Sequence, residues 1–241
     1  MDIKSYQRSG QKKNTTVAPA VTYYDDSVRP TNDKPDRSRF STHYTLDLSQ
    51  VINRWNVARL GFDFGHESGY LTDPYKQVLV GTEAQDERRP STRDSQAYSA
   101  GWRTKPFRPV AFDVMAAYYW DSWHVRSRSV RLMGLAELGE HWLVELMYRF
   151  YYQNPAYFWA DEYPSYNTDR YRSSDTRLSH FVSNTYSATA TYKATEAWWI
   201  EGALAYYAQN GRRDNNTVLW SQGDSVISAT IYSLAVQYRW W

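Results

Sequence analysis

Residues 142–153 read WLVELMYRFYYQ, and this stretch decides the fold. One side of it, from Trp142 to Tyr152, carries only apolar and aromatic residues, whereas the other side includes Glu145 and Arg149. A period of two predicts an extended strand rather than a helix. An outward row that faces lipid and an inward row that faces a polar interior would explain the two sides.

The same alternation returns along the whole chain. Residues 58–64, for example, place Leu60 and Phe62 on one side and Arg59 and Asp63 on the other. Counting such segments gives about ten strands, an even number as closed bacterial barrels require. The expected strands are 15–24, 42–51, 56–67, 97–105, 110–121, 129–138, 142–153, 182–193, 198–208 and 226–240.

The connections between these segments alternate in length, which supports the same fold. Short periplasmic turns and long extracellular loops are typical of outer-membrane barrels. The sequence therefore predicts an all-β fold: a transmembrane, antiparallel, up-and-down β-barrel in a bacterial outer membrane, with both termini periplasmic. The short connections are 52–55, 106–108, 139–141 and 194–197, and the long ones are 25–41, 68–96, 122–128, 154–181 and 209–225.

Composition limits the alternatives. Of the 241 residues, 17% are aromatic and none is Cys, while the mean hydropathy is -0.73. A low mean hydropathy fits a barrel, because only every second residue of a spanning strand meets lipid. A soluble β-sandwich would instead expose rows of Tyr, Trp and Leu far larger than soluble monomers tolerate. The formal net charge of +2 gives no reason to expect a nucleic-acid partner.

The chain divides into two parts by this interpretation. We expect residues 1–14 to be a polar periplasmic segment of a mature or truncated form with an added start Met, because no apolar signal-peptide core follows Met1. Residues 15–241 are then the outer-membrane barrel domain.

Four stretches stand out as a series. They are SGYLTDPYK at 68–76, YYWDSWHVRS at 118–127, YRFYYQ at 148–153 and SSDTRLS at 173–179. In this order they resemble the C-terminal portion of an outer-membrane barrel family catalogued as domain of unknown function 3570. The resemblance implies an outer-membrane barrel. The family has no established activity, so the resemblance implies no site residue.

The inward rows carry acids and bases in equal numbers. Ionisable groups at membrane depth tend to mark a solute path, but a barrel of about ten strands is narrow enough to be filled by a ladder of salt bridges. The balance of charge favours the filled interior. The predicted inward charges are Asp47, Arg59, Asp63, Arg103, Asp113, Arg131, Glu137, Glu145, Arg149, Lys193, Glu201 and Arg239.

Three histidines and one aspartate are the candidates for chemistry. His66, His124 and His180 fall at expected extracellular strand ends or loops, and Asp121 lies in the same layer. A His beside an acid can activate water. Polar residues are also ordinary at the headgroup boundary, and no Ser, His and Asp spacing compels a triad. No His pair has metal-ligand spacing. We therefore expect no catalysis, no metal and no cofactor.

The loop at 154–180 combines aromatic and charged residues. Its rings would make a recognition surface with a large contact area. They could equally fold over the mouth of the barrel as a compact cap. Both interpretations stay open at this point. The candidate contact rings are Tyr157, Phe158, Trp159, Tyr163, Tyr166 and Tyr171.

Three functions are compatible with this sequence. The first is non-enzymatic: a barrel, surrounded by outer-membrane lipid and lipopolysaccharide, whose surface loops dock a protein partner of an envelope complex. The second is a small-solute channel or one wall of a larger conduit. The third is a hydrolase or protease at the extracellular rim. The docking scaffold is our prediction.

Overall fold

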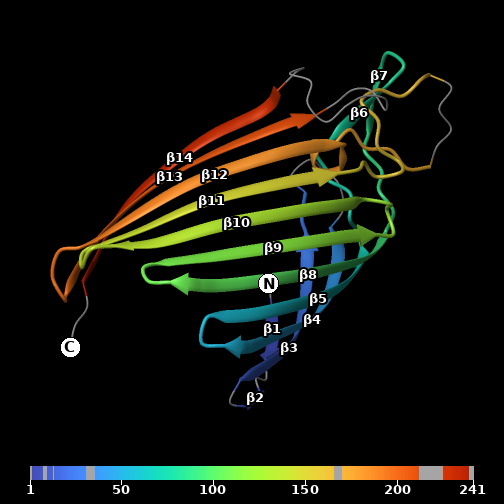
Figure 1. Ribbon diagram of the computed structural model, residues 1–241. Coiled ribbons are helices and arrows are strands. Elements are labelled where there is room, and N and C mark those ends of the chain that lie inside the picture. The colour runs from blue at the N-terminus through green and yellow to red at the C-terminus, as the bar shows by residue number, and fades with distance from the viewer. Residues whose placement is uncertain are drawn as a thin grey trace.

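The computed structural model describes residues 2–7, 10–12, 14–30, 36–165, 170–211 and 225–238. Twelve strands form one curved antiparallel sheet (Figure 1). In the described ranges no helix has the length and apolar character needed to cross a membrane. The elements are β1 (Asp2–Gln7), β2 (Gly10–Lys12), β3 (Thr15–Val28), β4 (Arg37–Asn53), β5 (Asn56–Gly69), β6 (Gln77–Val80), β7 (Glu83–Asp86), β8 (Thr92–Phe107), β9 (Val110–Asp121), β10 (Arg126–Leu138), β11 (Trp142–Gln153), η1 (Thr176–Leu178), β12 (Phe181–Lys193), β13 (Trp198–Gly211) and β14 (Ser225–Tyr238).

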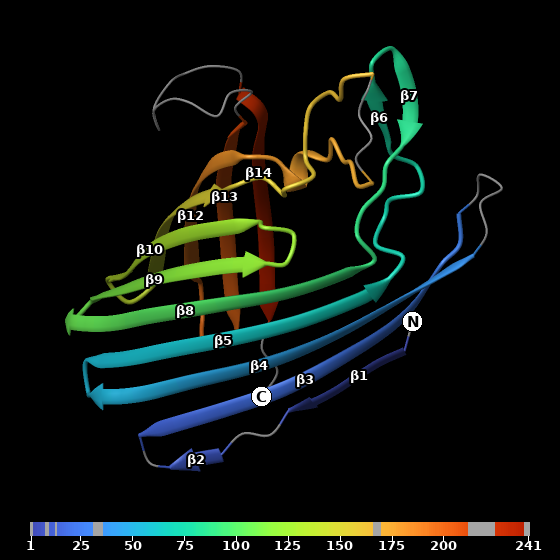
Figure 2. The same ribbon diagram turned by 90° about the vertical axis from the view of Figure 1, so that its right-hand side faces the viewer.

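From β3 to β14 the sheet is an up-and-down meander (Figures 1 and 2). Each strand pairs with the next one along the chain, except that β5 pairs with β8 across the separate β6–β7 hairpin. All the strands predicted from the alternation are present, and β9 and β11 have the predicted bounds. Others run further: β4 starts at Arg37 rather than at residue 42, because its ladder with β3 continues to Val28.

The pairing register separates two faces. Leu146 lies opposite Gly134 and Ala188, whereas Arg149 lies opposite Arg131 and Thr185. We call the side that carries Leu146 the outer face and the side that carries Arg149 the inner face. Because the side-chain period of a strand is two, the whole row of each strand follows these assignments.

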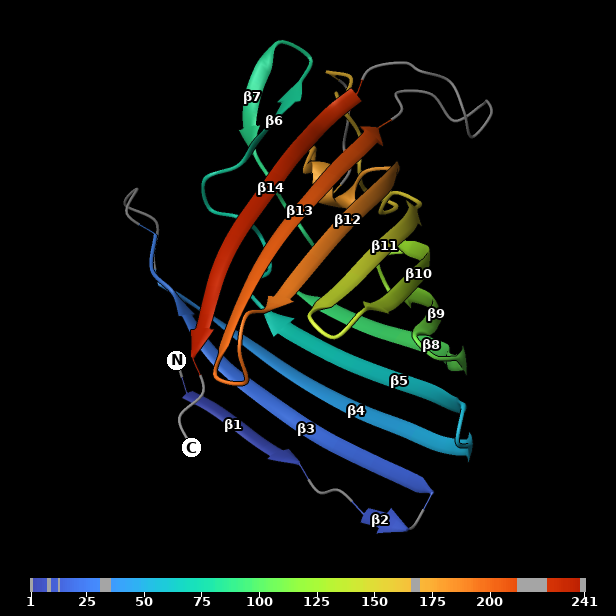
Figure 3. The ribbon, with the colours of Figure 1, turned by 60° about the vertical axis from the view of Figure 1, so that its left-hand side comes forward.

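The N-terminal residues extend the sheet, which the sequence did not predict. β1 and β2 both pair with β3, and Asp2 lies opposite Asp25. Because β1 runs antiparallel to β3, Asp2 lies toward the end of the sheet where β3 finishes, and not toward the end where Thr15 begins β3. In the described residues β14 pairs only with β13 and β1 only with β3, so the two edges are not joined to each other (Figure 3).

One connection that was expected to be long is short. Only residues 122–125 separate β9 from β10, where the sequence predicted a loop at 122–128. The Asp121 carboxylate accepts hydrogen bonds from the backbone N–H groups of Trp123 and Val125, at 2.9 and 3.0 Å. His124, with a φ of 66°, adopts the left-handed conformation that closes the turn. These local bonds let β10 begin earlier, at Arg126.

Candidate functional site

Two long connections fold together at one end of the sheet (Figures 1 and 2). Residues 70–91, which contain the β6–β7 hairpin, contact residues 154–165 and 170–180 of the second connection through backbone bridges from Val80 to Tyr163 and from Arg88 to Arg172. With the turn at 122–125, these two loops form one body, which we call the cap.

The cap has an apolar core of its own. Leu71 of the first loop, Trp123 of the turn and Phe158 of the second loop are all buried in one cluster. The rings of Trp123 and Phe158 meet edge to face with centroids 5.3 Å apart. Burial of each such side chain stabilises the folded state by about 1.5 to 3 kcal/mol. The cluster also includes Val125, Ala156 and Leu178, and a second cluster joins Val78, Val80 and Tyr163.

A buried carboxylate connects the two loops of the cap. Oδ2 of Asp175 lies 2.7 Å from both Arg89 Nη2 and Lys76 Nζ of the first loop, and 2.6 Å from Arg177 Nη2. Burial alone would raise the pKa of the Asp175 carboxyl, but hydrogen bonds from Arg177 and Lys76 overcome this and hold the pKa well below its ordinary value. Asp175 is therefore a charged clamp at neutral pH.

Glu87 forms a second clamp beside the first. Its buried carboxylate accepts hydrogen bonds from the hydroxyl of Ser173, from Arg89 Nη2 at 3.0 Å and from the backbone N–H of Asp73 at 3.2 Å. Arg89 thus bridges the carboxylates of Glu87 and Asp175. Removing one partner of a buried ion pair is strongly destabilising, so these contacts fix how the two loops pack against each other.

Asp121 anchors the cap to the sheet. While its Oδ1 holds the turn, its Oδ2 accepts bonds from Arg93 Nε at 2.9 Å, Arg93 Nη2 at 2.6 Å and the hydroxyl of Tyr119 at 2.8 Å. The Arg93 guanidinium also lies 4.6 Å from the centre of the Trp123 ring. One carboxylate therefore joins β8, β9 and the apolar core of the cap.

A second charged centre lies further along the inner face. Asp113 is only 2% exposed, and its carboxylate binds Arg59 Nη2, Arg103 Nε at 3.0 Å and, more loosely, Arg131 Nη2 at 3.6 Å. Within the described residues the buried Nε atoms of Arg59 and Arg131 have no hydrogen-bond acceptor. Three cations share one carboxylate here, so the centre carries excess positive charge.

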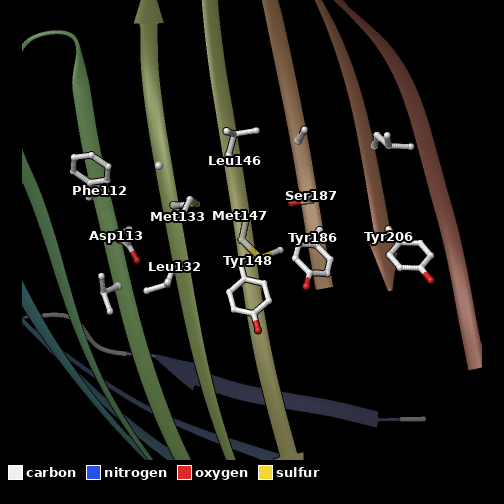
Figure 4. A pocket seen from close by; sticks show the side chains of 14 residues that line it. Phe112, Asp113, Leu132, Met133, Leu146, Met147, Tyr148, Tyr186, Ser187 and Tyr206 are labelled. Atoms are coloured by element: carbon white, nitrogen blue, oxygen red, sulfur yellow. The ribbon is translucent and has the colours of Figure 1, made fainter. Parts of the chain in front are cut away.

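The outer face over β9–β13 is apolar and shallowly grooved (Figure 4). A cross-strand row alternates large and small residues, in the order Phe112, Gly134, Leu146, Ala188 and Leu204. The small members leave a groove of about 720 Å³ between their large neighbours. Leu146 is 58% exposed and Leu204 is 54% exposed, so this row meets the surroundings of the protein.

The family described as protein of unknown function (DUF3570) has a sequence model that matches residues 36–233. This chain belongs to that family. A search of curated proteins finds no match. Among solved structures, the DUF3570 chain is similar to a KdgM porin in complex with disordered oligogalacturonate, at 12% identity and a TM-score of 0.36, over 99% of this chain and 98% of that one.

The four stretches that carried the resemblance to DUF3570 meet at the cap. Lys76 of the first pairs with Asp175 of the fourth, and Trp123 of the second lies in the apolar core. From the third, Gln153 Nε2 donates to the carbonyl oxygens of Arg177 and Ser179, at 2.9 Å each. Residues far apart in the sequence thus build one structure at one end of the sheet.

The predicted inward charges in the described residues all lie on the inner face, but they do not form a one-to-one ladder. Asp113 gathers Arg59, Arg103 and Arg131, whereas Glu137 pairs with Lys105 at 3.3 Å. Arg239 lies outside the described residues. Within the described residues no ion pair is formed by Asp47, Asp63, Glu145, Arg149, Lys193 or Glu201, although Glu201 accepts a hydrogen bond from Thr191 at 3.4 Å.

The candidate catalytic residues are separated. The Asp121 carboxylate accepts hydrogen bonds from the turn and from Arg93. The ring of His124 lies beside Tyr157, with 5.2 Å between the ring centroids. His66 Nδ1 lies 2.6 Å from Asp94 Oδ1, and by the register of β5 this pair is on the outer face. His180 packs edge to face against Tyr152. In the described part of the chain, no hydrogen bond or ring contact joins two of these histidines.

The candidate contact rings of the second loop differ in exposure. Phe158 and Tyr163 are buried, and the Tyr163 hydroxyl donates to the Phe158 carbonyl at 2.6 Å. Trp159 and Tyr171 are half-buried against the apolar core. Tyr157 is 52% exposed. Tyr166 lies outside the described residues.

Sequence reasoning missed the residues that hold the cap together. Lys76, Glu87, Arg89, Arg93 and Asp175 were not singled out, although each lies in or beside a long loop. Two of them were partly indicated, because Lys76 and Asp175 lie in the stretches 68–76 and 173–179 that carry the family resemblance. Their pairing across the sequence could not be read from either stretch alone.

Proposed function

We propose that this DUF3570 protein is an outer-membrane β-barrel of a Gram-negative envelope, whose folded cap is a docking surface for a protein partner. The observation that carries the proposal is the cap itself, because two loops and a turn share one apolar core and two buried carboxylate clamps. A pre-folded surface binds without the entropic cost of ordering loops.

The membrane assignment rests on the outer face. Exposed large apolar side chains continue across this face from β3 to β14, for example Leu60, Leu146 and Leu234, whereas soluble monomers rarely expose large contiguous apolar patches. Aromatic side chains lie toward the two ends of this face, with Trp120 near the cap and Trp102 and Trp142 near the short turns. Such belts are typical of lipid interfaces. Outer-membrane lipid and lipopolysaccharide would therefore surround the wall.

The open edges of the sheet must be satisfied in a membrane. Unpaired backbone groups of β1 and β14 would cost several kcal/mol each in lipid. We therefore expect the barrel to be closed when inserted, by pairing of its edges with each other or with further strands. We expect the short turns to lie in the periplasm. The cap then faces the outside of the cell, and Thr15 of β3 and Tyr238 of β14 lie at the periplasmic end.

Copurification from native outer membranes tests the docking role. Tyr157 and Leu79, 52% and 42% exposed, are exposed apolar side chains of the cap. We expect a partner identified by mass spectrometry to be lost from Tyr157→Ala and Leu79→Ala, whereas Trp55→Ala, an exposed ring at the opposite end, retains it. A partner that remains bound to both cap variants, or no partner at all, contradicts the proposal.

A channel is the second candidate, and the excess positive charge around Asp113 favours it. The three arginines around Asp113 form a local positive patch that would attract anions. Carboxylates such as Asp47 and Glu145, which form no ion pair within the described residues, lie elsewhere on the same face. Planar-bilayer conductance separates the two functions. The docking scaffold predicts an electrically silent protein, whereas a channel predicts discrete, anion-selective openings.

A further inference from the structure

A cavity of about 350 Å³ lies on the inner face directly below the cap. Ser129 of β10 and Arg149 of β11 line its wall, and Arg177 of the second loop lines the side toward the cap. The space is therefore bounded by the sheet and by the folded loops together. Ligand pockets commonly measure about 300 to 1,000 Å³, so this one suits a small solute.

The charge lining this cavity has one sign. Its charged residues are Arg93, Arg149 and Arg177, and none of its lining residues is Asp or Glu. Arg93 is paired with Asp121 and Arg177 with Asp175. In the described ranges Arg149 has no carboxylate partner, and its guanidinium lies 5.5 Å from the centre of the Tyr151 ring.

Arg149 also stands directly opposite Arg131 in the β10–β11 register. Like charges in opposite positions of a sheet destabilise it. Asp113 cannot neutralise this pair, because its carboxylate binds Arg131 only at 3.6 Å and is shared with Arg59 and Arg103. A bound anion at Arg149 would relieve the repulsion.

A neutral donor adds to the surroundings. Ser127 and Ser129 line the cavity together with Arg149. Because the Ser127 side chain is hydrogen-bonded to Tyr151, Ser129 is the hydroxyl to consider as a donor. A guanidinium with a neighbouring hydroxyl donor is a suitable site for an oxyanion, because charge-assisted hydrogen bonds to its oxygens are about twice as strong as neutral ones.

We propose that this cavity binds a small solute through its carboxylate or phosphate group, with Arg149 as the principal ligand and Ser129 as a further donor. This goes beyond the proposed docking function. The site faces the interior, so its occupation does not depend on a surface partner, and failure of the docking experiment would leave it unaffected.

Isothermal titration calorimetry of the full chain in detergent micelles tests the site, with sodium phosphate and sodium citrate as separate probes. We expect saturable binding of at least one probe, weakened by added sodium chloride. Arg149→Gln should lower its affinity about tenfold or more, as expected for loss of a hydrogen bond to a charged group. Arg128→Gln, on the outer face of β10 opposite Tyr152, should leave it unchanged.

The melting temperatures of the unliganded variants show whether a loss of binding comes from a loss of folding. Arg149→Gln should melt at the same temperature as the wild type or higher, since it removes a charge opposite Arg131. If it fails to fold, Arg149→Lys carries the test, and a weaker affinity than wild type supports the site because the bidentate fork is lost. Binding of one probe alone assigns the anion class. No saturable heat with either probe, or an affinity unchanged in the Arg149 variant, overturns the proposal.

Discussion

Placing an arginine on each face of β11 in turn tests which face meets lipid and which faces the lumen. Leu146 lies on the outer face between Trp142 and Phe150, opposite the small residues Gly134 and Ala188, which offer no partner to a guanidinium. Leu146→Arg should therefore destabilise the inserted barrel by about 2 to 4 kcal/mol, the cost of Arg near the bilayer midplane.

The neighbouring residue provides the control. Met147 faces inward, opposite Met133 and Ser187. This face also carries Glu145 and Arg149, so a new guanidinium there avoids lipid. Met147→Arg should cost less than about 1 kcal/mol, although Arg149 is close by. Urea titrations in lipid vesicles, followed by the fluorescence of the 11 tryptophans, measure both. Equal penalties, or a larger one for Met147→Arg, would refute the assignment of the faces.

Three further predictions concern the interior and the cap. Asp113→Asn should destabilise the protein by about 1 to 3 kcal/mol in the same titration, because its three arginines lose their shared carboxylate; no change would mean that lumen water screens them. Asp175→Asn should expose the loop at 154–180 to protease. Because folding lowers the pKa of Asp175, its stabilising effect should be complete above the ordinary value of 3.8 and be lost as the pH falls below it; wild-type protection that is equal at pH 7 and about pH 2.5 would contradict this. Deleting residues 156–172 should leave bilayer conductance nearly unchanged if, as the docking proposal expects, inward side chains close a narrow interior; a steady pore would favour the channel.

The strands could be predicted because the two faces of the sheet carry opposite kinds of side chain at adjacent residues. In 142–153 the period of two is uninterrupted, and β11 has the predicted bounds. At the start of β4, polar residues continue the hydrogen-bonded ladder beyond the alternating row. A strand predicted from hydrophobicity alone therefore begins too late there. Residues 1–14 have no such row, and β1 and β2 were missed for that reason.

The site was harder to predict, because its contacts join distant segments. The predicted inward charges in the described part of the chain share one face of the sheet, but the sequence suggested equal pairing, whereas the fold gathers Arg59, Arg103 and Arg131 around Asp113. Asp121 was considered as a catalytic acid because it was expected in the same layer as the three histidines. Its carboxylate instead closes the turn, a role that depends on backbone geometry.

Side-specific labelling of single cysteines tests the central claim most directly, namely that the cap stands outside an outer-membrane barrel. The chain has no Cys, so each introduced thiol is the only target. Leu79→Cys lies on the β6–β7 hairpin of the cap, and Glu140→Cys lies in the exposed turn between β10 and β11. In intact cells, a polyethylene glycol maleimide too large to cross the outer membrane should modify the first and not the second, which should react only after the membrane is permeabilised. Labelling of Glu140→Cys in intact cells, with Leu79→Cys protected, would contradict the account.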